Sequence, residues 1–185
     1  MLRHHAQLSA KMRWGVKMRQ VEVIERQLDR VLGFFPRVEA RINGLFAFNS
    51  IILTMVAINL TASDLLLWYV MIPAIVTGVG LSFSYYFLFK ANFPDTNGGE
   101  GNLVFFGEIK KQSEADYRDA LLGCSEDRYC KDLIGQIWRN SQILCAKYQG
   151  VKLAIVATAM SIVPFLWFLS ATAVTHGRIP LLKVG

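Results

Sequence analysis

The apolar residues of this chain gather in three blocks that contain no charged side chain. The blocks cover residues 44–62, 65–89 and 153–175. As a helix, the shortest block would extend about 28 Å, which is close to the thickness of the hydrocarbon core of a bilayer. A helix in the core of a soluble protein does not need such a length without one charge. The pattern therefore predicts an all-α integral membrane protein with three transmembrane helices.

The positive charges that flank these blocks predict the direction of each crossing. Four arginines precede the first block: Arg26, Arg30, Arg37 and Arg41. Lys90 follows the second block, whereas Ser63 and Asp64 alone separate the first two and bring no positive charge to the turn. Lysine and arginine accumulate on the cytoplasmic side of membrane proteins. We therefore expect the N-terminus to be cytoplasmic and the turn at Ser63 to lie outside.

Counting crossings from this start divides the chain into regions. Residues 1–43 and 90–152 are expected in the cytoplasm, and residues 176–185 form a periplasmic tail. The predicted location is the cell inner membrane, in a multi-pass arrangement. The charge bias around the third block is weak, so the position of the tail depends on the number of crossings.

The N-terminal polar region has the pattern of an amphipathic helix. Its apolar residues recur at alternating spacings of mostly three and four: Trp14, Met18, Val21, Ile24, Leu28, Val31 and Phe35. Residues at these spacings share one helix face. That face could pack on the protein's own cytoplasmic helices or on an identical subunit. Alternatively it could lie on the anionic inner leaflet, where Arg13, Lys17 and Arg19 would be favourable. Pro36 is expected to end or kink this helix.

The region between the second and third blocks is predicted to be a cytoplasmic helical domain. Residues 94–101 are rich in glycine, asparagine and aspartate, which is typical of a loop. Ser113, followed by acidic residues, has the pattern of a helix N-cap. A second helix is expected to start near Ser125. Because no strong breaker precedes Gly150, the pattern allows this helix to run directly into the third block.

Small and polar residues inside the blocks indicate how the spans pack. Ala74, Gly78 and Ser82 recur every four residues, as do Gly80 and Ser84, and such faces let helices approach closely.

Two asparagines inside the first block need hydrogen-bond partners in lipid. We interpret Asn49 and Asn59 as partners of groups on other helices or subunits, with the lining of a pore as the alternative. No titratable aspartate, glutamate, lysine, arginine or histidine lies within a block, which argues against a proton-coupled transporter.

The net charge and the positions of histidine and cysteine indicate no catalytic or metal-binding site. The formal charge of +6 lies beside an apolar block and is not interleaved with aromatic residues, so it favours membrane topology over nucleic-acid binding. The histidines and cysteines match no metal-ligand or catalytic spacing: His4, His5, His176, Cys124, Cys130 and Cys145. We therefore expect no metal, no cofactor and no enzymatic activity.

Three groups of residues carry a family resemblance. They are Arg41–Asn43 with Phe48–Ile52, then Asn102–Gly107 with Ser113 and Tyr117, and then Asp132, Gln136, Ile137, Ser141, Lys147 and Tyr148. Together they resemble the Pycsar transmembrane effectors of bacterial antiphage defence. The resemblance covers roughly residues 37–152 and the last block. The phenylalanine motif after a two-span hairpin is its most specific part.

The resemblance implies a partner pyrimidine cyclase that makes cyclic UMP or cyclic CMP on infection. It also implies a cytoplasmic sensor for that nucleotide, and spans that then impair the inner membrane and cause abortive infection. A homo-oligomer is expected. The candidate ligand-binding residues are Asn102, Phe105, Phe106, Lys110, Arg139, Lys147 and Tyr148. They offer cations for one phosphate charge and flat rings for a base, although each taken alone is more typical of core packing or of a solvated face.

Two other functions remain compatible with the sequence. One is a related effector that answers a different nucleotide signal, such as a cyclic oligonucleotide. The other is a membrane scaffold or regulatory subunit that binds no ligand. A transporter is disfavoured because the blocks lack charges and the chain lacks internal repeats.

Overall fold

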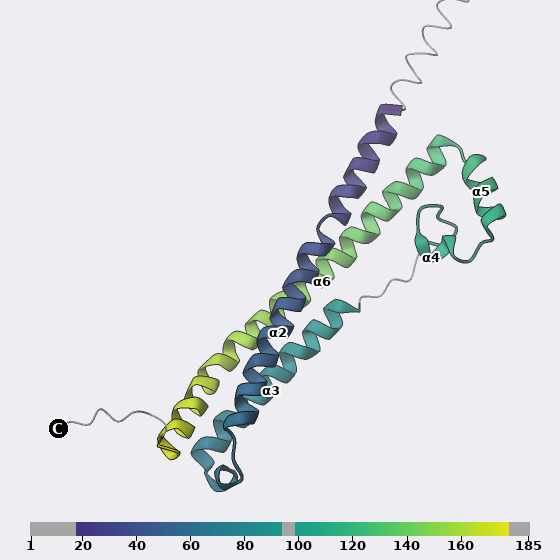
Figure 1. The fold of residues 1–185 in the computed structure, drawn as a ribbon. Helices are drawn as coiled ribbons and strands as arrows, with labels where there is room; N and C mark the ends of the chain where they lie inside the picture. The colour runs from purple at the N-terminus through teal and green to yellow at the C-terminus, as the bar shows by residue number, and fades with distance from the viewer. Residues whose placement is uncertain (1–17, 94–98, 178–185) are drawn as a thin grey trace, which may run out of the picture. The chain divides into compact units, whose positions relative to one another are not determined.

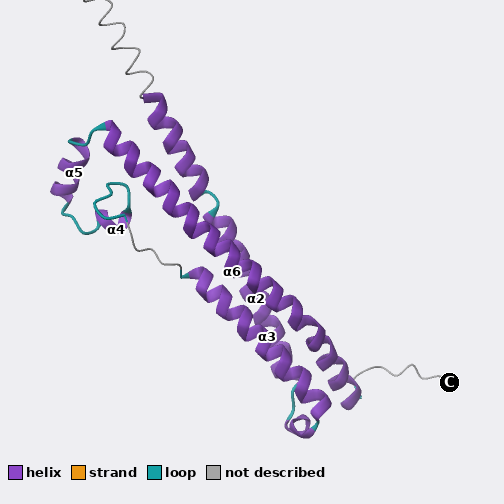
Figure 2. Cartoon of the chain, turned by 180° about the vertical axis from the view of Figure 1, so that it is seen from behind, coloured by secondary structure: helices purple, strands orange, loops and turns teal. Residues whose placement is uncertain are grey.

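The computed structural model describes residues 18–93 and 99–177, and every regular element in these ranges is helical (Figures 1 and 2). Its labelled elements are α2 (Phe35–Asn59), the 3-10 helix η1 (Ala62–Leu66), α3 (Trp68–Asn92), α4 (Phe106–Ile109), α5 (Glu114–Leu122) and α6 (Glu126–Thr175). Residues 18–32 are also helical. Trp14, Arg13 and Lys17 of the expected N-terminal helix lie outside the described residues. The all-helical prediction is confirmed for the described part of the chain.

The chain divides into two units. The first, called here the polar unit, contains Met1–Pro36 and Asp95–Cys145. The second, called the membrane unit, contains Arg37–Pro94 and Ala146–Gly185. α6 contributes its first part to the polar unit and the rest to the membrane unit.

Among the described residues, three helices are long and apolar enough to cross a membrane, as the three uncharged blocks predicted. They are Met18–Asn59, counted across a break at Gly33, then Trp68–Asn92 and Glu126–Thr175. In the most apolar 18-residue stretch of each helix, at most 33% of the stretch is buried against the rest of the chain. Their outward faces are therefore apolar and free to contact lipid, and we describe the chain as a membrane protein.

The turn between the first two spans is longer than the sequence indicated. α2 ends at Asn59 rather than at residue 62, and α3 begins at Trp68 rather than at residue 65. The carboxylate of Asp64 explains the difference, because its Oδ2 accepts hydrogen bonds from the Thr61 backbone N–H at 2.8 Å and from the Thr61 hydroxyl at 2.7 Å. This cap organises η1, which takes Leu65 and Leu66 out of the expected second span.

The break before α2 lies slightly earlier than predicted. Helical residues 18–32 end at Gly33 and Phe34, where the Gly33 N–H donates to the Asp29 carbonyl oxygen at 2.8 Å. Pro36 lies in the first turn of α2, so it starts the next helix instead of ending the previous one. Proline is well tolerated there, since the N–H that it lacks would have no partner within the helix.

The cap at Ser113, the helix start near Ser125 and the continuity of α6 are confirmed. The Ser113 hydroxyl accepts a hydrogen bond from the Asp116 N–H at 3.2 Å, and α5 follows directly. The Ser125 hydroxyl accepts from the Arg128 N–H at 3.3 Å, and α6 follows from Glu126. α6 then continues without interruption into the third uncharged block, with Pro164 inside it.

The apolar centre of the membrane unit lies near the turn. Val70, Ala74 and Phe168 are buried together there. Partly buried residues surround them: Val56, Leu60, Leu67, Leu169 and Ala171. This cluster packs the start of α3 against the last third of α6.

Candidate functional site

The loop that carries the phenylalanine motif is anchored to α6 by the side chain of Asn102. Its Oδ1 accepts hydrogen bonds from the N–H groups of Val104 at 2.9 Å and Phe105 at 3.0 Å. Its Nδ2 donates to the Asp132 carbonyl oxygen at 3.0 Å, and the Asp132 carboxylate accepts from the Leu103 N–H at 3.1 Å. Asn102 is thus buried and positions the loop, with no free side-chain acceptor aimed at solvent.

Two glycines and a tyrosine complete the loop. Gly99 and Gly101 have φ angles of 81° and 68°, a region that favours glycine, and the Gly99 carbonyl accepts from the Asn102 N–H at 2.9 Å. The Tyr117 hydroxyl on α5 donates to the carbonyl oxygen of the buried Leu103 at 3.2 Å. These bonds tie the loop and α5 together within the polar unit.

The two phenylalanines of the motif differ in exposure. Their ring centroids lie 4.9 Å apart with planes at 58°. Phe105 is partly buried against Gly107, where an added Cβ would lie 2.6 Å from the ring. Phe106 is 70% exposed and presents its ring to solvent. Of the pair, Phe106 is the one available to stack on a planar ligand.

Charged side chains surround the start of α4. Lys110 follows Phe106 by one turn and is exposed, and its backbone N–H donates to the Phe106 carbonyl oxygen at 3.1 Å. The Glu108 carboxylate accepts from Lys111 at 2.6 Å and from the Gly101 N–H at 3.2 Å. These bonds lower the pKa of Glu108, and the same contact raises the pKa of Lys111. Glu108 therefore stays ionised and holds the loop closed.

The remaining predicted ligand residues lie on α6, in both units. Arg139, in the polar unit, donates to the Gln142 side chain at 3.5 Å. Lys147 belongs to the membrane unit, is 5% exposed, and has its Nζ 3.4 Å from a Glu39 carboxylate oxygen. Tyr148 lies under the Arg41 guanidinium, 5.7 Å from the ring centroid. Asn102, Phe105, Phe106 and Lys110 thus share one loop, whereas Lys147 and Tyr148 contact α2.

The polar centre of the membrane unit is a closed ring of three hydrogen bonds. The Asn49 amide on α2 donates to the Ser84 hydroxyl on α3 at 2.8 Å. The Ser84 hydroxyl lies 2.9 Å from that of Thr158 on α6, and the Thr158 hydroxyl lies 2.9 Å from the Asn49 carbonyl oxygen, to which it donates. When Ser84 donates to Thr158, each hydroxyl donates once and accepts once. The Ala154 carbonyl oxygen, 3.1 Å from the Ser84 hydroxyl, is the alternative acceptor for the same proton.

The ring places Asn49 between helices. The side chains of Asn49, Ser84 and Thr158 are all buried. Asn59 differs, because its amide donates to the Met55 carbonyl oxygen of its own helix at 2.8 Å. Sequence reasoning missed Thr158, since a single threonine in an apolar block has no distinguishing pattern.

The two small-residue faces of α3 lie in different surroundings. Gly80 touches α6 so closely that an added Cβ would overlap the Ser161 hydroxyl. Ala74 is buried in the apolar cluster, but no described atom lies within 4 Å of the Cβ position of Gly78. Ser82 is exposed, and its hydroxyl donates to the Gly78 carbonyl oxygen at 2.8 Å. Within one chain, α3 approaches α6 closely along the face that contains Gly80 and Ser84. Gly78 and Ser82 stay on the surface.

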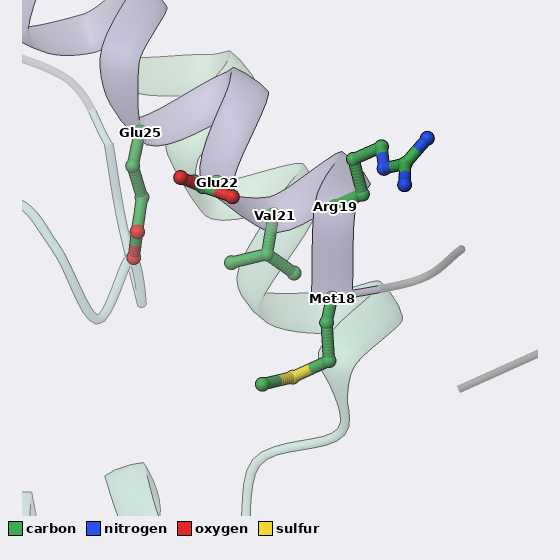
Figure 3. Close-up of a pocket in the computed structure, with 5 residues that line it drawn as sticks. All are labelled: Met18, Arg19, Val21, Glu22 and Glu25. Carbon is green, nitrogen blue, oxygen red and sulfur yellow. The ribbon is translucent and has the colours of Figure 1, made fainter. Parts of the chain in front are cut away.

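One hollow of the polar unit, shown in Figure 3, is unsuited to an anionic ligand. It has a volume of 420 Å³ and is lined by Met18, Arg19, Val21, Glu22 and Glu25. Figure 3 shows Arg19 pointing away from Met18 and Val21. Glu22 accepts a hydrogen bond from Arg26 at 2.6 Å, and Glu25 from the Tyr129 hydroxyl at 3.1 Å. Burial and the neighbouring Glu25 raise the pKa of Tyr129, so this phenol stays neutral.

A second hollow lies between helical residues 18–32 and the start of α6. Its volume is 740 Å³, and its lining residues are Arg19, Gln20, Val23, Ile24, Asp127, Cys130, Lys131 and Ile134. Arg19 and Lys131 bring two cations to this wall, and Asp127 brings one carboxylate. The sequence pattern gave no reason to bring these two residues together, because they are over a hundred positions apart.

A family model described as the Pycsar effector protein domain matches residues 23–174. No curated protein and no solved structure matches the chain. The matched range includes the loop with the phenylalanine motif, the polar ring and nearly all of α6.

Proposed function

The chain belongs to the Pycsar effector family of antiphage defence, and from this premise we propose that it is an inner-membrane effector activated by cyclic UMP or cyclic CMP. In this proposal a partner pyrimidine cyclase supplies the nucleotide on infection. The activated effector then impairs the membrane, and the infected cell dies or stops growing. The observation that carries the proposal is the family match over residues 23–174, which contains both a polar helical segment and three apolar helices.

The polar unit is the proposed sensor, and Phe106 with Lys110 is its proposed contact to the ligand. A cyclic pyrimidine nucleotide has one phosphate charge and one flat base. Phe106 offers an exposed ring, and Lys110 one turn later offers a cation. Asn102 and Phe105 are engaged in holding the loop, so we assign them a positioning role. The loop bonds to Asp132 would carry a change at Phe106 to α6.

The proposed output runs along α6. This helix belongs to both units and has no break between Glu126 and Thr175. Ligand binding that favours one packing of the polar unit would rotate or shift the same helix inside the bilayer. The Asn49 ring fixes how α6 meets the other two spans, so it is the contact that such a movement would change. We propose that homo-oligomers of the chain cause the membrane damage, with no enzymatic step.

Calorimetric titration of the purified full-length protein tests the sensor assignment. We expect cyclic UMP or cyclic CMP to bind, and cyclic AMP, cyclic GMP and cyclic dinucleotides to bind much more weakly. Phe106→Ala should weaken binding about tenfold, because stacking of a base on an aromatic ring contributes about 1–3 kcal/mol. Leu122→Ala, which removes another highly exposed apolar side chain of the polar unit, is the matched control.

The other outcomes favour the competing functions. Preferential binding of a purine nucleotide or a cyclic oligonucleotide would favour an effector that answers another signal. Failure of every nucleotide to bind a well-folded protein would favour the membrane scaffold. Loss of binding in both variants would show that the exposed apolar residues stabilise the unit and contact no ligand.

A further inference from the structure

An apolar groove runs between α3 and α6 in the membrane unit, with a volume of 400 Å³. Its lining residues are Val76, Val79, Gly80, Phe83, Phe87, Leu153, Val156, Ala157, Met160 and Ser161. The helices touch at Gly80, beside Ser161, and at Gly150, where an added Cβ would lie 2.7 Å from Ala91. Six of the ten lining residues are exposed, namely Val76, Val79, Phe83, Leu153, Val156 and Met160, so the groove opens toward the hydrocarbon region.

Two lysines mark one end of this groove. On α3 the lining face follows Gly80, Phe83 and Phe87 at spacings of three and four, and the next position on the same face is Lys90. On α6 the face that contains Met160 and Val156 continues one turn earlier to Lys152. Both lysines are exposed. The contact of Gly150 with Ala91 brings the two helices together at this level.

The acidic residues of the described membrane unit are all engaged away from the groove. Glu39 on α2 pairs with Lys147 at 3.4 Å. Asp64 in the turn accepts hydrogen bonds from Thr61 and lies 3.1 Å from His176. A second copy of the membrane unit therefore brings no uncommitted carboxylate to Lys90 and Lys152, so it would leave these two charges without an anionic partner.

We propose that this groove binds an anionic phospholipid, with one acyl chain along its apolar wall and the phosphate between Lys90 and Lys152. The bilayer supplies the acyl chain directly, because the groove is open to it. Lys90 and Lys152 each lie directly beside an uncharged block, and lysine ammonium groups at the end of such a block reach the headgroup level, where they attract anionic lipids. Bound at a contact between α3 and α6, the lipid would make activity depend on membrane composition.

Native mass spectrometry of the full-length protein in neutral detergent tests this site. The probes are palmitoyl-oleoyl phosphatidylglycerol and, as the uncharged-headgroup comparison, palmitoyl-oleoyl phosphatidylcholine. We expect the phosphatidylglycerol to bind preferentially, and Lys90→Gln and Lys152→Gln each to weaken its binding roughly fivefold. Arg37→Gln removes an exposed cation of α2, a helix that contributes nothing to the groove, and should have little effect.

A second pair of variants tests the acyl-chain wall. Val156→Phe should fill the groove and lower binding of both lipids, whereas Ile155→Phe should not. Val156 and Ile155 are 49% and 50% exposed, so they form a matched pair of which only Val156 lines the groove.

Several outcomes would overturn the proposal. Equal binding of both lipids, or binding that ignores the two lysines, would exclude a headgroup site. A shift from dimer to monomer on Val156→Phe without a change in lipid binding would assign the groove to a second copy. These measurements read lipid occupancy and oligomeric state without any nucleotide, so their outcome is independent of the nucleotide response.

Discussion

The side-chain amide of Asn49 donates a hydrogen bond to the hydroxyl of Ser84 across 2.8 Å, between the first and second spans. Thr158 closes the ring from the third span. In lipid, apolar side chains gain little by exchanging neighbours, whereas a polar group that loses its partner is costly. The ring therefore specifies one rotation and one depth for each of the three helices.

Replacement of Ser84 should destabilise the membrane unit more than replacement of the neighbouring Ser82. Ser84→Ala removes the bond accepted from Asn49 and the bond that the one hydroxyl proton donates to Thr158 or to the Ala154 carbonyl oxygen, at about 0.6 kcal/mol for each bond. Ser82→Ala removes only a bond to the carbonyl of its own helix. The measurement is the thermal midpoint of the detergent-solubilised protein. Equal midpoints for the two variants would show that the ring contributes no specific stability.

Loss of the Asn102 side chain should release the phenylalanine loop without unfolding α6. Asn102→Ala deletes two bonds within the loop and one to the Asp132 carbonyl oxygen, together about 3 kcal/mol at most. Hydrogen–deuterium exchange should become faster in residues 103–105. Asn140→Ala, whose amide bonds only the Gln136 carbonyl of its own helix, is the control. Unchanged protection at Val104 and Phe105 would contradict the anchoring role.

The turn at Asp64 predicts an acid-sensitive contribution to stability. Hydrogen bonds from the Thr61 backbone and hydroxyl, followed by the contact with His176, lower the pKa of Asp64 below its ordinary value. A carboxyl group whose pKa is lowered by folding stabilises the protein above its unfolded pKa. That stability is lost as the pH falls through the folded pKa, which here means below about pH 4.

Asp64→Asn is the variant that isolates this effect. It should be less stable than the wild-type protein near pH 7, and the difference should shrink as the pH falls below about 4. Thermal midpoints measured across this range would show it. A constant difference at all pH values would mean that Asp64 acts through its shape and not through its charge.

The continuity of α6 predicts that sensing and membrane damage can be separated. Cys145 and Ala146 are exposed and meet at the boundary between the two units. The double variant Cys145→Pro with Ala146→Pro should interrupt the helix there, leaving nucleotide binding intact and abolishing depolarisation. Cys145→Ala with Ala146→Ser is the control that keeps the helix. Depolarisation that survives the prolines at normal expression would contradict transmission along α6.

Several parts of the fold could be predicted because they depend on local chemistry or on the solvent. Three uncharged blocks of bilayer length determine three spans, whatever the sequence on either side. Ser113 and Ser125 predict helix starts because each serine hydroxyl accepts a hydrogen bond from the backbone N–H only three residues later. The turn at Asp64 was underestimated, since its carboxylate recruits residues on both sides into η1.

The rest depends on how the helices are rotated against one another. Gly78 and Gly80 lie two residues apart and each has a serine four residues later, but only Gly80 faces α6. The sequence alone does not show which of these two faces of α3 packs against α6. The packing face depends on the hydrogen bonds that Ser84 makes with Asn49 and Thr158. Likewise, Lys147 and Phe106 carry suitable chemistry for one ligand, but the folded chain gives them different neighbours.

Membrane potential in living bacteria tests the central claim most directly. Cells would express the chain with an active pyrimidine cyclase or with a catalytically dead one, and a voltage-sensitive dye would report the potential. The account predicts depolarisation only with the active cyclase, and its loss in the chain that carries Phe106→Ala. An unchanged potential in cells that contain cyclic UMP or cyclic CMP, with the chain present in the membrane at normal levels, would contradict the assignment as a pyrimidine-nucleotide effector.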